Sequence, residues 1–157
     1  MTRAEYPGIL AINAAGRPGV AALDEAELDR LASISNQHFV AIDNANRVVG
    51  YLLAFHREAP YECEEFREFH AAFEQRFIYV DQIAIAEHHR GTGLGRRLYG
   101  VIQSVAIDQG IRFLCCDVNT SPPNPNSSAF HRTLGFKTFS HRPTLDGREV
   151  ELLTKSL

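Results

Sequence analysis

The chain has 157 residues, 45% hydrophobic and 22% charged, an ordinary composition for one globular domain covering residues 1–157. Its 16 Lys and Arg residues against 19 Asp and Glu residues give a formal net charge of -3, which argues against nucleic acid as a partner. The longest apolar runs, such as 48–55, stop well short of the roughly 20 residues of a membrane span, and the amino terminus lacks a leader pattern. We therefore expect a cytoplasmic protein that does not bind membranes.

Hydrophobic periodicity and turn residues divide the chain into alternating helices and strands. The predicted elements are a strand at 9–14, a helix at 24–35, strands at 39–42 and 47–55, a helix at 62–75, a strand at 77–86, a helix whose apolar stripe runs from Leu94 to Val105, a strand at 112–118, a helix at 126–134, and strands at 136–141 and 148–154. The strands before and after the Leu94 helix form a βαβ unit, so we expect them to be parallel. The Asp146-Gly147 pair predicts the last turn.

Local signals support several of these elements. Asp24 followed three residues later by Glu27 is typical of a capping box at a helix start. The helix at 62–75 is rich in glutamate, which favours either a solvated face or attraction of a cationic amine. Strand 47–55 is apolar throughout, which predicts burial on both faces.

The cysteine and histidine patterns do not indicate a metal or a disulfide framework. Cys63, Cys115 and Cys116 are too few for such a framework and lack the paired spacing of a zinc site, which fits a reducing compartment. The 7 histidines are scattered without ligand spacing, so no metal is expected. Cys115 and Cys116 lie in a strand that reads as buried, where at least one serves as a small apolar filler.

The most informative stretch is Arg90-Gly91-Thr92-Gly93-Leu94-Gly95, placed where a strand passes into a helix. The first N–H groups of a helix lack partners and its dipole is positive there, so backbone alone can hold an anion. Glycines let a pyrophosphate approach that backbone, and Arg90 adds a positive charge. Two alternatives are a plain tight turn and a dinucleotide fold. A dinucleotide fold requires a glycine where Arg96 stands and an opening strand near the start of the domain. This sequence meets neither requirement.

Here the sequence resembles the GNAT superfamily of acyl-CoA N-acyltransferases, whose R-x-x-G-x-G signature matches residues 90–95. A second match is the segment from Asn126 to Gly135-Phe136, which is similar to the last helix and Gly-Phe closure of that family. The resemblance covers nearly the whole chain and is strongest to a bacterial subgroup of predicted acetyltransferases with an Asn-x-x-Pro-Pro-Asn-Pro loop, here 119–125. It implies an α/β fold with a mixed, twisted central sheet of about six to seven strands, flanked by helices, in which a central strand pair splays apart.

The resemblance implies transfer of an acetyl group from acetyl-CoA, as co-substrate, to a primary amine by direct attack in a ternary complex. Main-chain N–H groups of the strand before the signature would polarise the thioester carbonyl. The coenzyme is expected to contact Ile83, Ala84, Ile85, Arg90, Gly91, Thr92, Gly93, Leu94, Gly95, Arg96, Asn119, Asn126 and Ser127. Asn126 has a structural alternative as the cap of the last helix.

Proton transfer needs further side chains. Many family members place tyrosine four residues before the closing glycine as proton donor, and His131 occupies that position here. A charged imidazole would protonate a thiolate, whereas the structural alternative makes His131 a packing residue or a coenzyme contact. Asp81 is the carboxylate inside the strand before the signature, where it serves either as base or as a buried structural partner. Water is the third option for the base.

The acceptor is a small molecule or a peptide that the sequence does not identify. A noncatalytic acyl-CoA-binding or sensor domain on the same fold is the alternative function, because His131 replaces tyrosine and the base is uncertain. A nucleotide-binding regulatory module is a third reading. The resemblance also implies that a homodimer can form, through sheet edges or closing strands.

Overall fold

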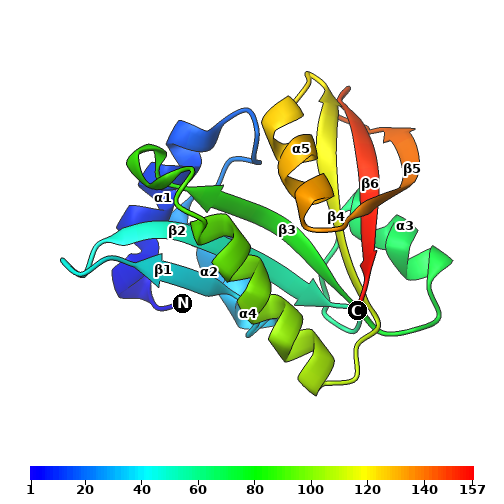
Figure 1. Ribbon diagram of the computed structural model, residues 1–157, viewed down its shortest axis with the longest axis horizontal. Coiled ribbons are helices and arrows are strands. Elements are labelled where there is room, and N and C mark those ends of the chain that lie inside the picture. The colour runs from blue at the N-terminus through cyan, green and yellow to red at the C-terminus, as the bar shows by residue number, and fades with distance from the viewer. The chain divides into compact units, whose positions relative to one another are not determined.

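The computed structural model describes all residues, Met1–Leu157 (Figure 1). The helices are α1 (Tyr6–Gly16), α2 (Glu25–Ile34), α3 (Glu64–Ala72), α4 (Leu94–Asp108) and α5 (Pro125–Thr133), with short 3-10 turns η1 (Arg3–Glu5) and η2 (Glu87–His89). The strands are β1 (Phe39–Ile42), β2 (Val48–His56), β3 (Phe77–Ile85), β4 (Phe113–Ser121), β5 (Lys137–Pro143) and β6 (Glu149–Ser156). None of the helices is long and apolar enough to cross a bilayer.

The six strands form one mixed sheet in the order β1-β2-β3-β4-β6-β5. The β3/β4 pair is parallel, whereas β1/β2, β4/β6 and β5/β6 are antiparallel. The predicted α/β class, the strand number and the parallel βαβ pair are confirmed. Within the chain two compact units are distinguished, Met1–Phe55 with Asp81–Ile102, and His56–Val80 with Gln103–Leu157. A single domain over 1–157 stays a prediction.

The β3/β4 pairing covers only part of both strands. Its register runs from Phe77 opposite Phe113 to Val80 opposite Cys116, the first four residues of each nine-residue strand. The pairing therefore stops midway along both strands, which agrees with the splayed central pair that the sequence predicted. Asp81 and Asp117 are the first residues beyond the paired segment on their respective strands.

The first unit contains α1, α2, β1 and most of β2. The strand predicted at 9–14 is wrong, because these residues lie inside α1. Ile9, Ile12 and Asn13 are buried at helical spacing, and Pro at the first helical turn supports the helix start. A six-residue apolar run has too little periodicity to distinguish strand from helix.

The other elements of the first unit follow the sequence closely. α2 begins after Asp24, whose Oδ1 accepts a hydrogen bond from Glu27 N at 2.7 Å, as the capping signal predicted. The β1/β2 hairpin is confirmed, with Phe39 opposite Leu52, and the seven central residues of β2 are buried.

The second unit has β4, β6 and β5 side by side, with α3 and α5 on opposite faces of these strands (Figure 1). α3 is shorter than the predicted 62–75, because Cys63 caps its start by accepting from Phe66 N at 3.3 Å. Phe66 and Phe69 of α3 pack against Tyr79 of β3. The turn at Asp146-Gly147 is confirmed, with φ of 85° at Gly147. Both Cys115 and Cys116 are buried, as expected for apolar fillers.

Candidate functional site

The glycine loop between β3 and α4 exposes its backbone on the first unit. Gly91 and Gly93 have φ angles of 75° and 82°, which residues with side chains rarely adopt. A Cβ added to either glycine would meet no heavy atom within 4 Å. The loop therefore presents an open backbone surface at both positions.

The start of α4 contributes backbone donors to the same loop. Its first hydrogen bond runs from Arg97 N to Gly93 O at 3.0 Å, so the N–H groups of residues 94–96 have no acceptor within the helix. The helix dipole makes this end positive, and the exposed Arg90 and Arg96 side chains add charge. Such an arrangement fits an anion, as the sequence predicted for a coenzyme pyrophosphate.

Contacts within the first unit fix the loop to the end of β3. Arg90 Nε donates to Ile85 O at 3.2 Å, and Thr92 Oγ1 donates to His89 O at 2.7 Å. Gly50 of β2 allows the close packing beneath: a Cβ there would lie 2.7 Å from Ile85 Cδ1 and 3.2 Å from Ala84 O. The loop is thus held by the strand whose main chain was predicted to polarise the thioester.

That strand places Ile83, Ile85 and Asp81 half-buried, with Ala84 buried between them. Asp81 lies close enough to Tyr51 for its charge to affect that hydroxyl. Burial is the main cause that raises the pKa of Tyr51 to about 12; a hydrogen bond with Asn13 opposes it and the Asp81 charge adds to it.

A buried polar cluster lies beside Asp81 in the first unit. Asn13 Nδ2 donates to Ala21 O at 2.8 Å and to Gln82 Oε1 at 3.0 Å, and the Tyr51 hydroxyl donates to Gln82 Oε1 at 3.0 Å. Asn13 Oδ1 also accepts from Leu23 N at 3.0 Å. The cluster ties the segment between α1 and α2 to β3.

His131 lies on α5 in the second unit and is only 3% exposed. Its Nδ1–H donates to Ser127 O at 2.8 Å, one helical turn earlier, and the ring packs edge-on against Phe130 and Phe136. Burial lowers the pKa of His131; the bond to Ser127 opposes this shift and the charge of Arg132 adds to it. The imidazole is therefore mostly neutral near pH 7, which reduces its capacity to donate a proton.

The predicted asparagine contacts have different surroundings. Asn119 is 9% exposed, and its Oδ1 accepts from Arg148 Nη1 at 2.9 Å. The cap of α5 is Asn124, whose Oδ1 accepts from Ser127 N at 3.2 Å, so the structural alternative of Asn126 as that cap is wrong. Asn126 lies exposed on the first turn, since Pro125 already occupies the first helical position.

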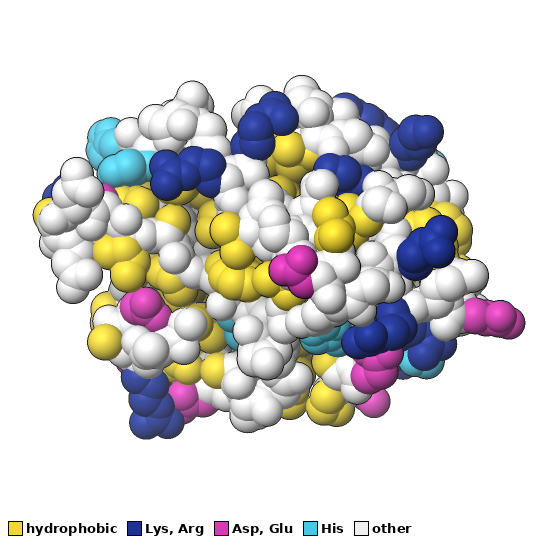
Figure 2. All heavy atoms as spheres, turned by 60° about the horizontal axis from the view of Figure 1, so that its bottom comes forward, with side chains coloured by type: hydrophobic (Ala, Val, Ile, Leu, Met, Phe, Trp, Pro, Cys, Tyr) yellow, Lys and Arg dark blue, Asp and Glu magenta, His cyan; other side chains and the backbone are white.

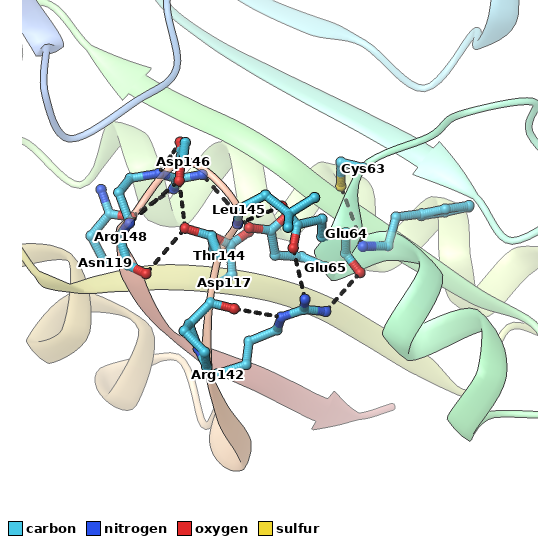
Figure 3. A network of polar contacts seen from close by, with 12 residues as sticks. Cys63, Glu64, Glu65, Asp117, Asn119, Arg142, Thr144, Leu145, Asp146 and Arg148 are labelled. Atoms are coloured by element: carbon cyan, nitrogen blue, oxygen red, sulfur yellow. Dashed lines mark hydrogen bonds and ion pairs between the residues drawn. The ribbon is translucent and has the colours of Figure 1, made fainter.

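Two arginines of the second unit, which sequence reasoning did not single out, neutralise part of the acidic helix (Figure 3). Arg142 on β5 donates to Glu64 Oε2 at 2.7 Å and to Glu68 Oε2 at 2.9 Å. Arg148 donates to Asp146 Oδ2 at 2.7 Å and lies 3.7 Å from Glu65 Oε1. These glutamates are thus paired within the chain. Neither alternative for this helix, a solvated face or the attraction of a cationic amine, included such pairing.

A further pair links β3 to β4 in the second unit. The Tyr79 hydroxyl donates to Asp117 Oδ1 at 2.5 Å, and Cys63 Sγ lies 3.8 Å from the same hydroxyl. Asp117 was not predicted as a site residue. The argument applied to Asp81, a carboxylate inside a largely apolar strand, applies equally to Asp117 and would have found it.

The surface charge is mixed on the face drawn in Figure 2, where Lys and Arg side chains are interspersed with Asp and Glu and with small hydrophobic areas. This distribution agrees with the small net charge of the chain.

The sequence profile of the acetyltransferase (GNAT) family matches residues 11–136. The chain therefore belongs to this family, and the resemblance based on the glycine signature is confirmed. No protein with a curated description shows significant sequence similarity. The subgroup with the Asn-x-x-Pro-Pro-Asn-Pro loop stays a prediction.

Solved structures share the fold at low sequence identity. Naa20 from Chaetomium thermophilum, in complex with a bisubstrate analogue, is 17% identical with a TM-score of 0.77, over 99% of this chain and 84% of that one. A ribosomal-protein-alanine N-acetyltransferase from Brucella melitensis is 22% identical with a TM-score of 0.72, over 100% and 97%. A phosphinothricin acetyltransferase from Sinorhizobium meliloti, in complex with AcCoA, is 21% identical with a TM-score of 0.73, over 100% and 85%.

Proposed function

We propose that this chain transfers an acetyl group from acetyl-CoA to a primary amine by direct attack in a ternary complex. The observation that carries the proposal is the glycine loop: in a chain of the acetyltransferase family, an open backbone surface adjoins the unpaired N–H groups at the start of α4. This is the arrangement that a coenzyme pyrophosphate requires.

The loop residues Gly91, Gly93 and 94–96 supply backbone donors to the pyrophosphate, and Arg90 and Arg96 supply charge. Thr92 acts indirectly, because its hydroxyl holds the loop by donating to His89 O. The main chain of Ile83, Ala84 and Ile85 polarises the thioester carbonyl, as in strand addition by an extended ligand. Asn119, Asn126 and Ser127 are proposed as additional coenzyme contacts.

Two proton transfers accompany the reaction. His131 is the proposed donor to the leaving thiolate, and its burial predicts that donation is most effective on the acid side of neutrality, where more imidazole is charged. The acceptor ammonium must lose a proton before its nitrogen can attack, and Asp81 is the proposed base, with water as the alternative.

The experiment is release of free thiol from acetyl-CoA with three acceptors, a pentapeptide with a free α-amine, spermidine and glucosamine. Amine-dependent thiol release together with acetylated acceptor in the mass spectrum supports the proposal. Acetyl-CoA binding with no release for any amine would instead favour the noncatalytic acyl-CoA-binding domain. The neighbours named above act on protein and small-molecule amines, so the panel contains both kinds.

A further inference from the structure

The peptide group between Ile85 and Ala86, at the end of β3, is held from both sides. Its N–H end, Ala86 N, donates to Val49 O of β2 at 2.9 Å. The C=O and N–H bonds of a trans peptide point in opposite directions, so Ile85 O faces away from β2. There it accepts a hydrogen bond from Arg90 Nε at 3.2 Å. This peptide group is therefore fixed between β2 and the Arg90 side chain.

The preceding peptide group, between Ala84 and Ile85, is fixed by close packing on the β2 side. A Cβ on Gly50 would lie 3.2 Å from Ala84 O and 2.7 Å from Ile85 Cδ1, so the absence of a side chain at position 50 permits this approach. Because Ala84 O lies toward β2, the Ile85 N–H at the other end of the group points away from β2. The peptide groups on both sides of Ile85 thus have fixed orientations.

The turn that follows β3 brings Arg90 back to the strand. His89 N donates to Ala86 O at 2.8 Å, and Arg90 N donates to Glu87 O at 3.1 Å. These bonds close η2 and place the Arg90 side chain beside Ile85 O. The contact to Ile85 O uses Nε, so the two Nη nitrogens can face the coenzyme phosphates.

The direction of the Ile85 N–H matters for the reaction. It is one of the main-chain donors assigned above to the thioester carbonyl. A donor of this kind stabilises the negative charge that develops on the thioester oxygen as the amine attacks, and its effect depends on being aimed at that oxygen beforehand. A residue that fixes the orientation of Ile85 therefore acts on the rate of the chemical step.

Resting on the proposed acetyl transfer, we propose that Arg90 is a positioning residue for this donor, in addition to supplying charge. Its Nε–H holds the peptide group between Ile85 and Ala86, and so keeps the Ile85 N–H directed at the thioester oxygen. The two roles of Arg90 have different consequences. Loss of the Nε–H donor slows the chemical step, whereas loss of the positive charge weakens binding of the coenzyme.

Two neutral substitutions separate these roles. Glutamine places its Nε2 amide the same number of bonds from Cα as the arginine Nε, whereas methionine places a methyl group there. Both remove the charge, so CoA affinity measured by isothermal titration should fall by a similar factor, about 5-fold. Only Arg90→Met loses the donor, so its kcat at saturating acetyl-CoA should fall about 10- to 100-fold, whereas Arg90→Gln should rescue most of kcat.

Further measurements distinguish positioning from a general structural effect. The kcat loss in Arg90→Met should be the same for spermidine and for the free α-amine pentapeptide, because Ile85 acts on the thioester and not on the amine. Arg97→Met, at an exposed arginine near the start of α4, is the control and should leave kcat unchanged. If Arg90→Met does not fold, Arg90→Lys replaces it, because lysine has a methylene group at the place of Nε.

The outcomes separate this inference from the proposed function. Equal kcat values for Arg90→Gln and Arg90→Met would overturn the positioning role and leave Arg90 with a role through charge alone. A kcat loss that differs between the two acceptors would also contradict it. Amine-dependent thiol release by the unsubstituted chain in these cases leaves the proposed function standing. No thiol release from the unsubstituted chain would overturn the proposed function and this inference together.

Discussion

Substitution of Gly93 by aspartate places a negative charge in the coenzyme loop. The Cβ of residue 93 enters open space, so the carboxylate meets no neighbour within the chain and faces the region assigned to the pyrophosphate. At about 4 Å in a water-like dielectric each pair of unit charges repels by about 1 kcal/mol. Two phosphate charges give about 2 kcal/mol, which corresponds to about a 30-fold weaker affinity for CoA.

Two comparisons isolate this effect. Gly93→Asn adds a side chain of similar size without charge, so the difference between the Asp and Asn variants measures repulsion. Gly110→Asp introduces the same residue at another open glycine with positive φ, 67°, and should leave CoA affinity unchanged. Isothermal titration with CoA is the assay, and the Asp variant should recover affinity in 1 M salt, where the Debye length is about 3 Å. Equal CoA affinities for the Asp, Asn and unsubstituted forms would refute the loop assignment.

Three further predictions concern the donor, the packing under the loop and the pH dependence of stability. His131→Phe should lower kcat for acetyl transfer about 10- to 100-fold with unchanged CoA affinity; an unaltered kcat in steady-state assays would remove His131 from proton transfer. Gly50→Ala should cost about 1–3 kcal/mol of unfolding free energy, because its Cβ would lie 2.7 Å from Ile85 Cδ1; urea unfolding with no loss would contradict the packing. Burial lowers the pKa of His38, against the opposing bond to Leu31 O, so the unfolded chain binds more protons below about pH 6.5 and the free energy of unfolding falls with falling pH. His38→Gln should give a shallower slope between pH 6.5 and 5, and an identical slope would argue against this titration.

Local signals explain where sequence reasoning succeeded. The cap at Asp24 and the turn at Gly147 depend on residues within a few positions, so short motifs suffice to predict them. The glycine signature likewise combines a turn with a helix start in one continuous segment. The strand prediction for 9–14 failed because so short a run shows too little periodicity. The helical spacing of the buried positions 9, 12 and 13 becomes evident only once their packing partners are known.

Contacts between distant segments explain most of what was missed. Arg142 pairs with Glu64 although 78 positions separate them. The pattern of residues within α3 does not predict Arg142 as the partner. The contact between Tyr79 and Asp117 depends on the parallel register of β3 and β4, which the sequence suggests but does not fix. The lowered pKa of His131 comes from burial, which the helical pattern alone did not predict.

The most direct test of acetyl-CoA dependence is a comparison of melting temperatures with acetyl-CoA, CoA, ATP and NAD at equal concentration. A ligand that binds only the folded chain stabilises it by about 2.7 kcal/mol at a concentration 100 times its Kd. Acetyl-CoA and CoA are predicted to raise the melting temperature, with no comparable shift from ATP or NAD. A shift from NAD or ATP alone, or no shift from either coenzyme form, would contradict an acetyl-CoA-dependent acetyltransferase.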